Sequence, residues 1–231
     1  MKNIYGNGEY LVSNPDWHIA DSPWKAKQII NIIVKNGLNP STICDVGCGA
    51  GEIINQLYGQ LPPNTIFHGY EISPQAFELC QKRKKDRVFF LLKDLFEEND
   101  VFFDLVLAID VFEHIEDYFS FLRKLKNKGK YKIFHIPLDI SVQSVIRKSA
   151  IMKWRETYGH IHYFTKDIAL AALKDTGYEI IDYYYAPGSI ELPNRNFKSS
   201  LLEFPRKLLF SLNKDFTVRL MGGFSLMVLA K

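Results

Sequence analysis

The sequence predicts an α/β protein built on a doubly wound, mostly parallel sheet. Three observations support this prediction: short apolar runs alternate with amphipathic runs, a glycine-rich turn follows the first apolar run, and acidic residues follow later ones. Such alternation is typical of a parallel sheet with helices on both faces. The chain has 231 residues, of which 47% are hydrophobic, and this is enough for one sizeable core. We therefore expect a single domain.

The elements follow from the local pattern. The first helix is expected to start at Ser22, because serine favours the N-cap and Pro23 fits the first turn. Thr165 is expected to cap a later helix that stops at Gly177. In chain order the pattern predicts strands near 42–46, 65–71, 88–93, 103–109, 130–136, 178–185 and 224–230, with helices near 51–60, 74–84, 116–127 and 165–176.

Two stretches outside this alternation are expected to cover the sheet. The N-terminal cap comprises residues 1–40, and the core comprises 41–186 and 223–231. Residues 187–222 stand between the last two strands, which predicts a lid over the sheet edge where open α/β sheets bind ligands. The alternative for this segment is peripheral membrane contact, because basic residues stand among Leu and Phe. Pro205 is expected to interrupt its helical run, which disfavours this alternative.

The stretch from Thr42 to Glu52, TICDVGCGAGE, places a tight glycine turn between an apolar run and a helical pattern. This arrangement indicates a nucleotide-type ligand at the end of the first strand. Gly47, Gly49 and Gly51 read G-x-G-x-G, and Glu52 stands where the dinucleotide fingerprint needs its third glycine. A side chain at either of the first two glycines would block close approach of the backbone to a ligand.

Acidic residues follow three later strand-like runs, at Glu71, Asp94 and Asp110. We expect them at the ligand-binding edge of the sheet, because the carboxyl ends of parallel strands meet there. Such an edge would repel a pyrophosphate, which favours helix N-termini and hydrogen-bond donors. It suits a ligand with ribose hydroxyls, an adenine amine and a positive charge. S-adenosylmethionine has all three features.

Four segments resemble successive motifs of the Rossmann-like (class I) S-adenosylmethionine-dependent methyltransferases. They are DVGCGAG from Asp45, GYEIS from Gly69, KDL from Lys93 and DLVLAIDVFEHI from Asp104. Within the family, the chain is most similar to the small-molecule enzymes that carry an Asp-Val-x-Glu-His motif after the fourth strand. The resemblance implies S-adenosyl-L-methionine as the cofactor. It also implies seven strands, with the last one antiparallel between the fifth and the sixth.

The resemblance further implies which residues bind the cofactor. Glu71 would accept both ribose hydroxyls, in agreement with its position about 20 residues beyond the glycine turn. Asp94 would accept from the adenine amine, and Asp110 would flank the methionyl group. The expected cofactor-binding residues are Asp45, Gly47, Cys48, Gly49, Glu71, Ile72, Asp94, Leu95, Ile109 and Asp110.

Methyl transfer needs little covalent chemistry from the protein, because the sulfonium is already an activated methyl donor. Alignment of the donor with the acceptor provides most of the rate enhancement. A base is needed only where a hydroxyl must lose its proton. The GHIHYFT segment offers His160 and His162, and its likeness to G-H-x-x-x-F-T segments singles out His160 as the catalytic residue. Glu113 and His114 either cap the following helix or face the substrate. His135, in an apolar strand, is expected in the core or in the pocket wall.

Composition argues against several other classes. The net charge of +3 gives no electrostatic reason to expect nucleic acid, and the Asn/Asp-Pro-Pro-Tyr/Phe signature of DNA base methyltransferases is missing after the fourth strand. Three cysteines are too few for a disulfide framework, and no familiar Cys/His spacing is completed, so no metal is expected. With no signal-like segment and no apolar run of about 20 residues, we expect a cytoplasmic location.

The sequence therefore predicts a methyltransferase that acts on a small molecule, at the hydroxyl oxygen of a sugar, a quinone or a natural-product-like acceptor. One alternative is an NAD-dependent oxidoreductase, which Glu52 and the acidic strand ends disfavour. The other is a binding protein that keeps the cofactor fold without turnover, since a fold alone does not establish an activity.

Overall fold

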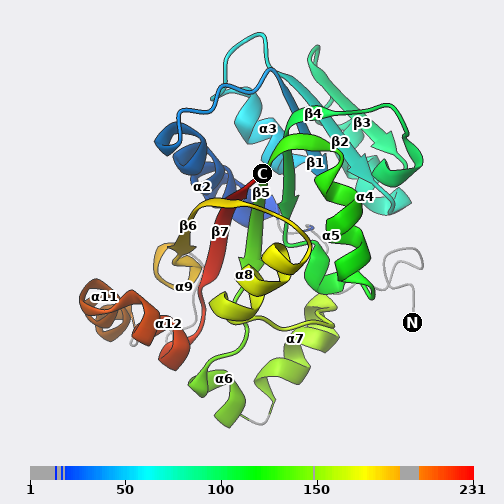
Figure 1. Cartoon of the computed structure of the whole chain (residues 1–231). Helices are drawn as coiled ribbons and strands as arrows, with labels where there is room; N and C mark the ends of the chain where they lie inside the picture. Colours follow the sequence, from blue (N-terminus) through cyan, green and yellow to red (C-terminus); the bar gives the residue numbers. More distant parts are fainter. Residues whose placement is uncertain (1–13, 15–16, 18, 148, 193–202) are drawn as a thin grey trace.

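The computed structural model describes residues 14, 17, 19–147, 149–192 and 203–231. A seven-stranded sheet with the order β3-β2-β1-β4-β5-β7-β6 forms its centre (Figure 1). Neighbouring strands are parallel except at β7, which runs antiparallel to both β5 and β6. This confirms the predicted sheet. The strands are β1 (Thr42–Val46), β2 (Ile66–Glu71), β3 (Val88–Leu92), β4 (Phe103–Ile109), β5 (Gly129–Pro137), β6 (Ile180–Ala186) and β7 (Ser225–Ala230).

The central strands are mostly apolar because helices cover both faces of the sheet. In β4, Leu105 and Leu107 contribute to one core cluster, whereas Val106 and Ala108 contribute to the other. Successive side chains of a strand point to opposite faces, so one short run supplies both cores. Glycine at position 129 is required where β5 begins, since an added Cβ would lie 2.9 Å from the backbone oxygen of Phe103.

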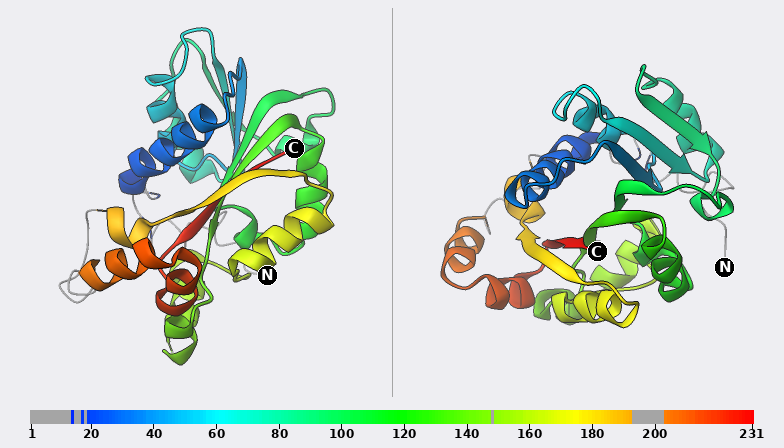
Figure 2. Two further views of the ribbon diagram at one scale, coloured as in Figure 1. Left: turned by 60° about the vertical axis from the view of Figure 1, so that its left-hand side comes forward. Right: turned by 45° about the horizontal axis from the view of Figure 1, so that its top comes forward.

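The two cores have different helical covers (Figure 2). On one face lie α2 (Ser22–Lys35), α3 (Glu52–Tyr58) and α4 (Pro74–Gln81), which contribute Ile29, Ile54 and Cys80 to the core. On the other lie α5 (Tyr118–Lys126) and α8 (Lys166–Asp175), which contribute Leu122 and Leu173. Each helix places its apolar stripe on the sheet, as expected of a doubly wound fold.

The helix starts agree with the predicted caps, with one change. The hydroxyl of Thr165 accepts a hydrogen bond from the amide of Ile168 and so caps α8, as predicted. At α2, however, Asp21 occupies the N-cap position and Ser22 is the first helical residue. The helix still benefits from Pro23, because the fixed φ of proline suits the first turn.

Short helices gather beyond the carboxyl ends of β4 and β5 (Figure 1). They are α6 (Val142–Ile146), α7 (Ala150–Tyr158), α9 (Gly188–Glu191), α11 (Glu203–Leu212) and α12 (Lys214–Met221). Three 3-10 turns, η1 (Ile19–Asp21), η2 (Leu95–Glu97) and η3 (Phe112–His114), complete the described elements. The sequence pattern predicts no helix between β5 and α8, but α6 and α7 lie there. Of the apolar side chains of α7, Ile151, Trp154 and Tyr158 are half-buried and do not belong to the core.

Pro205 does not interrupt the helical run as expected. It lies in the first turn of α11, where the missing backbone N–H would have had no intrahelical partner. The helix continues to Leu212, and α12 follows after the cap residue Asn213, which accepts from the amide of Phe216. In the described part of the chain, no helix has both the length and the apolar character needed to cross a membrane.

Candidate functional site

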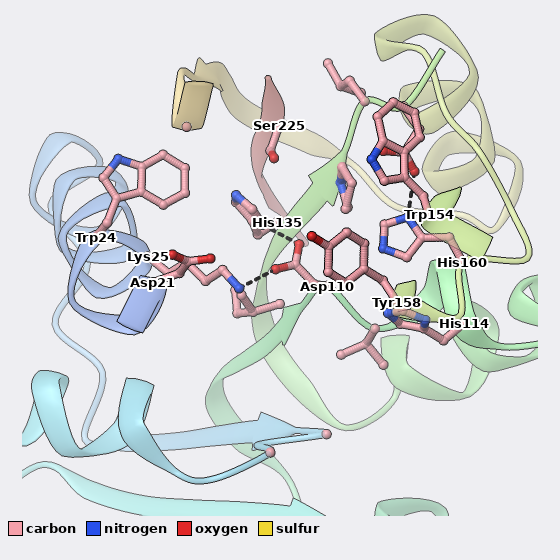
Figure 3. A pocket seen from close by; sticks show the side chains of 18 of the residues that line it. Asp21, Trp24, Lys25, Asp110, His114, His135, Trp154, Tyr158, His160 and Ser225 are labelled. Atoms are coloured by element: carbon pink, nitrogen blue, oxygen red, sulfur yellow. Dashed lines mark hydrogen bonds and ion pairs between the residues drawn. The ribbon is translucent and has the colours of Figure 1, made fainter. Parts of the chain in front are cut away.

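A cavity of about 670 Å³ opens at the carboxyl ends of the central parallel strands. Its volume lies within the range of pockets that hold small molecules and cofactors. One end is lined by the glycine turn after β1 and by the last residue of β2, and the other by the segment after β5 and by α7. In Figure 3, Trp24 and Lys25 lie on one side, and Trp154 and His160 lie on the opposite side.

The glycine turn brings the backbone to the cavity wall. Gly47 and Gly49 have φ values of 68° and 55°, in the left-handed region that favours glycine. The amide of Gly47 donates to the carbonyl oxygen of Tyr70 over 2.8 Å and ties the turn to β2. An added Cβ at Gly49 would meet only Trp17, at 3.9 Å. The space beside Gly49 therefore allows a ligand to approach the backbone closely.

Glu71 ends β2 at the same wall and is 6% exposed. One carboxylate oxygen accepts from the amide of Gly49 over 2.8 Å, and the other accepts from the amides of Ile72 and Ser73. Burial raises the pKa of this carboxyl group, and the three amide donors oppose that rise. The side chain thus links the two strand ends and leaves acceptor capacity at the cavity, since a carboxylate has about four lone-pair sites.

Asp45 and Cys48 lie behind the turn and do not line the cavity. Asp45 is 1% exposed, and its Oδ2 has no hydrogen-bond partner among the described residues. Burial and the charge of Glu71 raise the pKa of Asp45 to about 8, against the opposing effect of Lys25. The sulfur of Cys48 lies 3.8 Å from the sulfur of Cys80.

We predict that Asp45 makes the stability of the protein fall with rising pH. Between about pH 4, where an unfolded aspartate titrates, and about pH 8, the folded state keeps a proton that the unfolded state has lost. The free energy of unfolding should therefore fall more steeply in the wild type than in Asp45→Asn, by up to about 1.4 kcal/mol per pH unit. Denaturant unfolding of both proteins at several pH values measures this difference. A difference that stays constant with pH would contradict the prediction.

Asp110 forms a partly buried ion-pair cluster with Lys25 and His135 at the middle of the cavity (Figure 3). Its Oδ2 lies 2.7 Å from Nζ of Lys25, and its Oδ1 lies 2.5 Å from Nδ1 of His135. Burial alone would raise the pKa of Asp110, but the charges of His135 and Lys25 hold it well below its usual range. Asp110 also has a φ of 55°, a conformation that aspartate tolerates better than most residues.

Lys25 is a site residue that the sequence analysis missed. It lies in α2, four residues before Ile29 and seven before Ile32, which are both fully buried. This spacing places a lysine on the apolar face of an amphipathic helix. A cation on a buried stripe needs a partner, because an unpaired buried charge is costly. This local signal could have indicated Lys25 as a functional candidate.

The opposite end of the cavity carries a histidine–aspartate pair. His160 is 8% exposed, and its Nδ1 lies 2.7 Å from Oδ2 of Asp139, so the imidazole donates to the carboxylate. Both residues line the cavity together with Trp154 and Tyr158 of α7. His162 lies elsewhere: its Nε2 donates to the backbone oxygen of Ile115, and its side chain does not line the cavity.

Glu113 and His114 lie in η3, next to His160. Glu113 is fully buried, and neither of its carboxylate oxygens has a hydrogen-bond partner in the described part of the chain. Burial and the charge of Asp110 raise the pKa of Glu113 well above its usual range. Nδ1 of His114 lies 3.2 Å from the backbone oxygen of Gly159, to which it donates. Both residues thus face the loop that carries His160 rather than the following helix.

The cavity brings together seven of the eleven residues predicted to bind the cofactor or to be catalytic: Gly47, Gly49, Glu71, Ile72, Ile109, Asp110 and His160. Asp94 and Leu95 are not among its lining residues. Asp94 is exposed and accepts from the amide of Phe96 at the start of η2, and Leu95 is buried in the core. The lining residues that the sequence analysis did not single out as site residues include Asp21, Lys25, Asp139 and Arg206.

A sequence profile described as a methyltransferase domain matches residues 17–183, which is more than two thirds of the chain. The chain belongs to the class I S-adenosylmethionine-dependent methyltransferases. S-adenosylmethionine is accordingly its cofactor, as the sequence analysis predicted. Membership of the methyltransferase family also decides against the NAD-dependent oxidoreductase.

Solved structures share the methyltransferase fold at low sequence identity. Magnesium protoporphyrin IX methyltransferase from Synechocystis PCC 6803, with bound S-adenosylhomocysteine, has a TM-score of 0.61 and 16% identity, over 94% of this chain and 85% of that one. A putative sarcosine dimethylglycine methyltransferase from Galdieria sulphuraria has a TM-score of 0.62 and 14% identity, over 89% and 84%. The plantazolicin methyltransferase has a TM-score of 0.60 and 16% identity, over 97% and 88%. No curated protein sequence matches this methyltransferase.

Proposed function

We propose that the protein transfers the methyl group of S-adenosylmethionine to a hydroxyl oxygen of a small molecule. The observation that carries the proposal is the cavity with two chemically different ends, one at Glu71 and one at His160. In the reaction the bond between sulfur and the methyl carbon breaks, and its electron pair stays on sulfur. The acceptor oxygen forms the new bond to carbon and loses its proton. Alignment of the two reactants in one enclosed space provides most of the acceleration.

The cofactor end has groups that complement each part of S-adenosylmethionine. The remaining acceptor sites of Glu71 bind the ribose hydroxyls, and the open backbone at Gly49 lies beside the methionyl part. Asp110 and Lys25 present a negative and a positive charge on the same wall, which match the ammonium and the carboxylate of the methionyl zwitterion. Asp94 follows β3, the neighbour of β2, and in this proposal its carboxylate accepts a hydrogen bond from the adenine amine.

The acceptor end supports His160 as the residue that acts on the hydroxyl group. Asp139 holds its imidazole, and the aromatic side chains of Trp154 and Tyr158 line the space around it. Aromatic walls suit a planar or sugar-like acceptor. The segment predicted as a lid contributes Gly188, Ser189, Leu192 and Arg206 to the cavity lining. We therefore propose that the described parts of this segment, residues 187–192 and 203–222, close the acceptor end and select the acceptor; its residues 193–202 lie outside the described residues.

Calorimetric titration tests the cofactor part of the proposal. The purified protein should bind S-adenosylhomocysteine with micromolar affinity and should not bind NAD. Transfer is then tested with methyl-labelled S-adenosylmethionine and pairs of acceptors that differ only in carrying a hydroxyl or an amine. Label transferred to the hydroxyl member supports the proposal, and label transferred only to the amine member overturns the oxygen acceptor. Binding of the cofactor with no transfer to either member would favour the non-catalytic alternative.

A further inference from the structure

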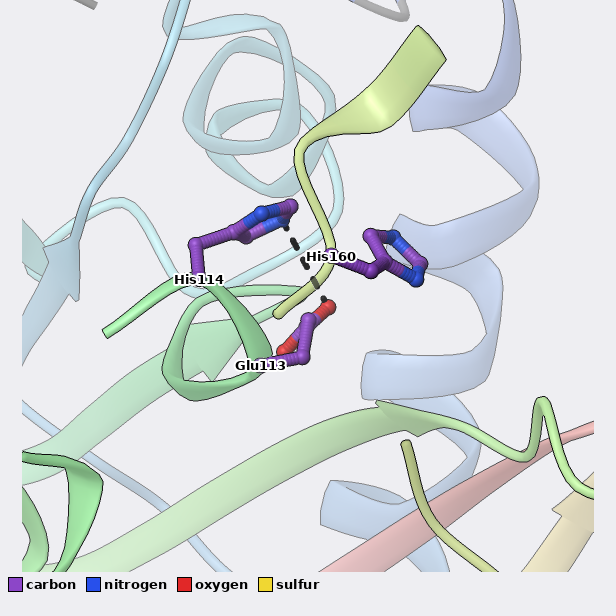
Figure 4. Close-up of side chains that lie close together, drawn as sticks. All are labelled: Glu113, His114 and His160. Carbon is purple, nitrogen blue, oxygen red and sulfur yellow. Dashed lines mark ion pairs between the residues drawn. The ribbon is translucent and has the colours of Figure 1, made fainter. Parts of the chain in front are cut away.

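Glu113, His114 and His160 lie close together beside the acceptor end of the cavity (Figure 4); His114 and His160 line the cavity, and Glu113 lies behind them. Each residue offers one donor atom, and the three atoms lie within 4.8 Å of one another. Nε2 of His114 lies 3.8 Å from Oε1 of Glu113, and the ring centroids of His114 and His160 are 5.0 Å apart. Two ligands of a tetrahedral zinc ion lie about 3.4 Å apart when each bond is about 2.1 Å long. The donor atoms are therefore up to about 1.4 Å farther apart than in a formed zinc site, so the side chains would have to move closer together on binding an ion.

The hydrogen bonds around both imidazole rings fix the tautomer that a metal requires. Nδ1 of His160 donates to the carboxylate of Asp139, and Nδ1 of His114 donates to the carbonyl oxygen of Gly159. In each neutral ring the lone pair therefore resides on Nε2. A histidine that binds a metal through one nitrogen usually donates its other N–H to a carboxylate or to a backbone carbonyl. Both of these partners are in place.

The environment of Glu113 independently points to a cation-binding site. Its side chain is 0% exposed, and both of its oxygens lack hydrogen-bond partners in the described part of the chain. Leaving a buried carboxylate without partners is costly, and native proteins avoid it unless the group has a specific use. The ammonium group of Lys25 pairs with Asp110 and makes no hydrogen bond to this carboxylate. A bound cation would satisfy both oxygens.

We propose that Glu113, His114 and His160 bind a divalent first-row transition metal ion at the acceptor end of the cavity. Two imidazole nitrogens and one carboxylate form a donor set that suits zinc, manganese or iron rather than magnesium or calcium, which prefer oxygen ligands. Three protein ligands leave coordination positions open. The sequence predicts no metal because no familiar Cys/His spacing is completed, and Glu113–His114 and His160 come from separate segments.

This inference rests on the proposed function, because the open positions lie where the acceptor is expected to bind. A hydroxyl bound to the ion has a lowered pKa, as bound water does, and its proton leaves to water before the methyl group arrives. His160 then acts on the acceptor through the ion that it holds. The substrate class is accordingly a small molecule whose methylated hydroxyl can coordinate a metal.

Metal binding by the protein alone provides the test. Protein freed of metal with a chelator is titrated with Zn²⁺ by calorimetry and with Co²⁺ by visible absorption, which reports the coordination number and geometry of the bound ion. We expect one ion per chain at micromolar affinity or tighter. Glu113→Gln and His160→Ala should each weaken binding at least 100-fold, and Asp139→Asn should weaken it by about 10- to 100-fold because it orients a ligand. His68→Gln, which removes a histidine outside the cavity, should bind as the wild type does.

Three outcomes separate this inference from the proposed function. Each variant is first shown to be folded by its melting curve, and its affinity for S-adenosylhomocysteine is measured in parallel. If the folded wild type binds the cofactor but no metal, the metal site is wrong and the methyltransferase proposal stands. The same conclusion follows if the folded variants bind metal as tightly as the wild type does. If metal binds as expected but the cofactor does not, the cofactor part of the proposed function fails instead.

Discussion

Asp110→Asn is expected to lower the free energy of unfolding by about 3–5 kcal/mol, the usual cost of breaking a buried ion pair from one side. The substitution leaves Lys25 and His135 facing a neutral amide in a site that is largely shielded from solvent. Asparagine preserves the size of the side chain and accepts the positive φ of this position. The loss therefore reports the charge rather than the backbone. Urea unfolding without cofactor measures it.

The matched control is the double variant Lys25→Met/Asp110→Asn. Removing both charges leaves no unpaired lysine at the site, so the double variant should lose less stability than the sum of the two single variants. The difference is a direct measure of the coupling between the two side chains. Additive losses would show that the ion pair makes no net contribution.

Glu71→Ala is expected to weaken the binding of S-adenosylhomocysteine by about 10²- to 10⁴-fold, the equivalent of losing two hydrogen bonds to a charged acceptor. The side chain is the carboxylate that lines the cavity at the end of β2. The substitution also removes the bonds to the amides of Gly49 and Ser73, so the glycine turn loses its link to the following loop. Calorimetry on protein that melts cooperatively measures the affinity.

Glu52→Ala is the control for this prediction. Glu52 lies directly after the glycine turn, but its carboxylate pairs with Arg83 and does not line the cavity. The Glu52→Ala variant is expected to bind S-adenosylhomocysteine with an affinity within about threefold of that of the wild type, since changes away from the ligand have small effects. Equal affinity of wild type and a folded Glu71→Ala variant would remove the ribose assignment.

The sheet was predictable because its signals are local and repeated. β4 shows the reason: after Asp104 it continues as the apolar run LVLAI, and such a run is either a strand buried on both faces or a short core helix. The glycine turn was equally readable, since Gly47 and Gly49 stand at fixed spacing after a strand. In contrast, α7 is short and places no residue in the core, although it contributes Trp154 and Tyr158 to the cavity.

The sequence by itself determined the strands, the glycine turn, Glu71 at the cavity and the family, because each of these depends on residues that are neighbours in the chain. Only the tertiary structure decided that Lys25 and His135 meet at Asp110, and that His160 joins Glu113. These contacts join distant segments, and their geometry depends on how helices and loops pack onto the finished sheet. No local pattern encodes that packing. Lys, His, Glu and Asp are mostly exposed in proteins, so their positions in the sequence do not reveal which of them meet in a cavity.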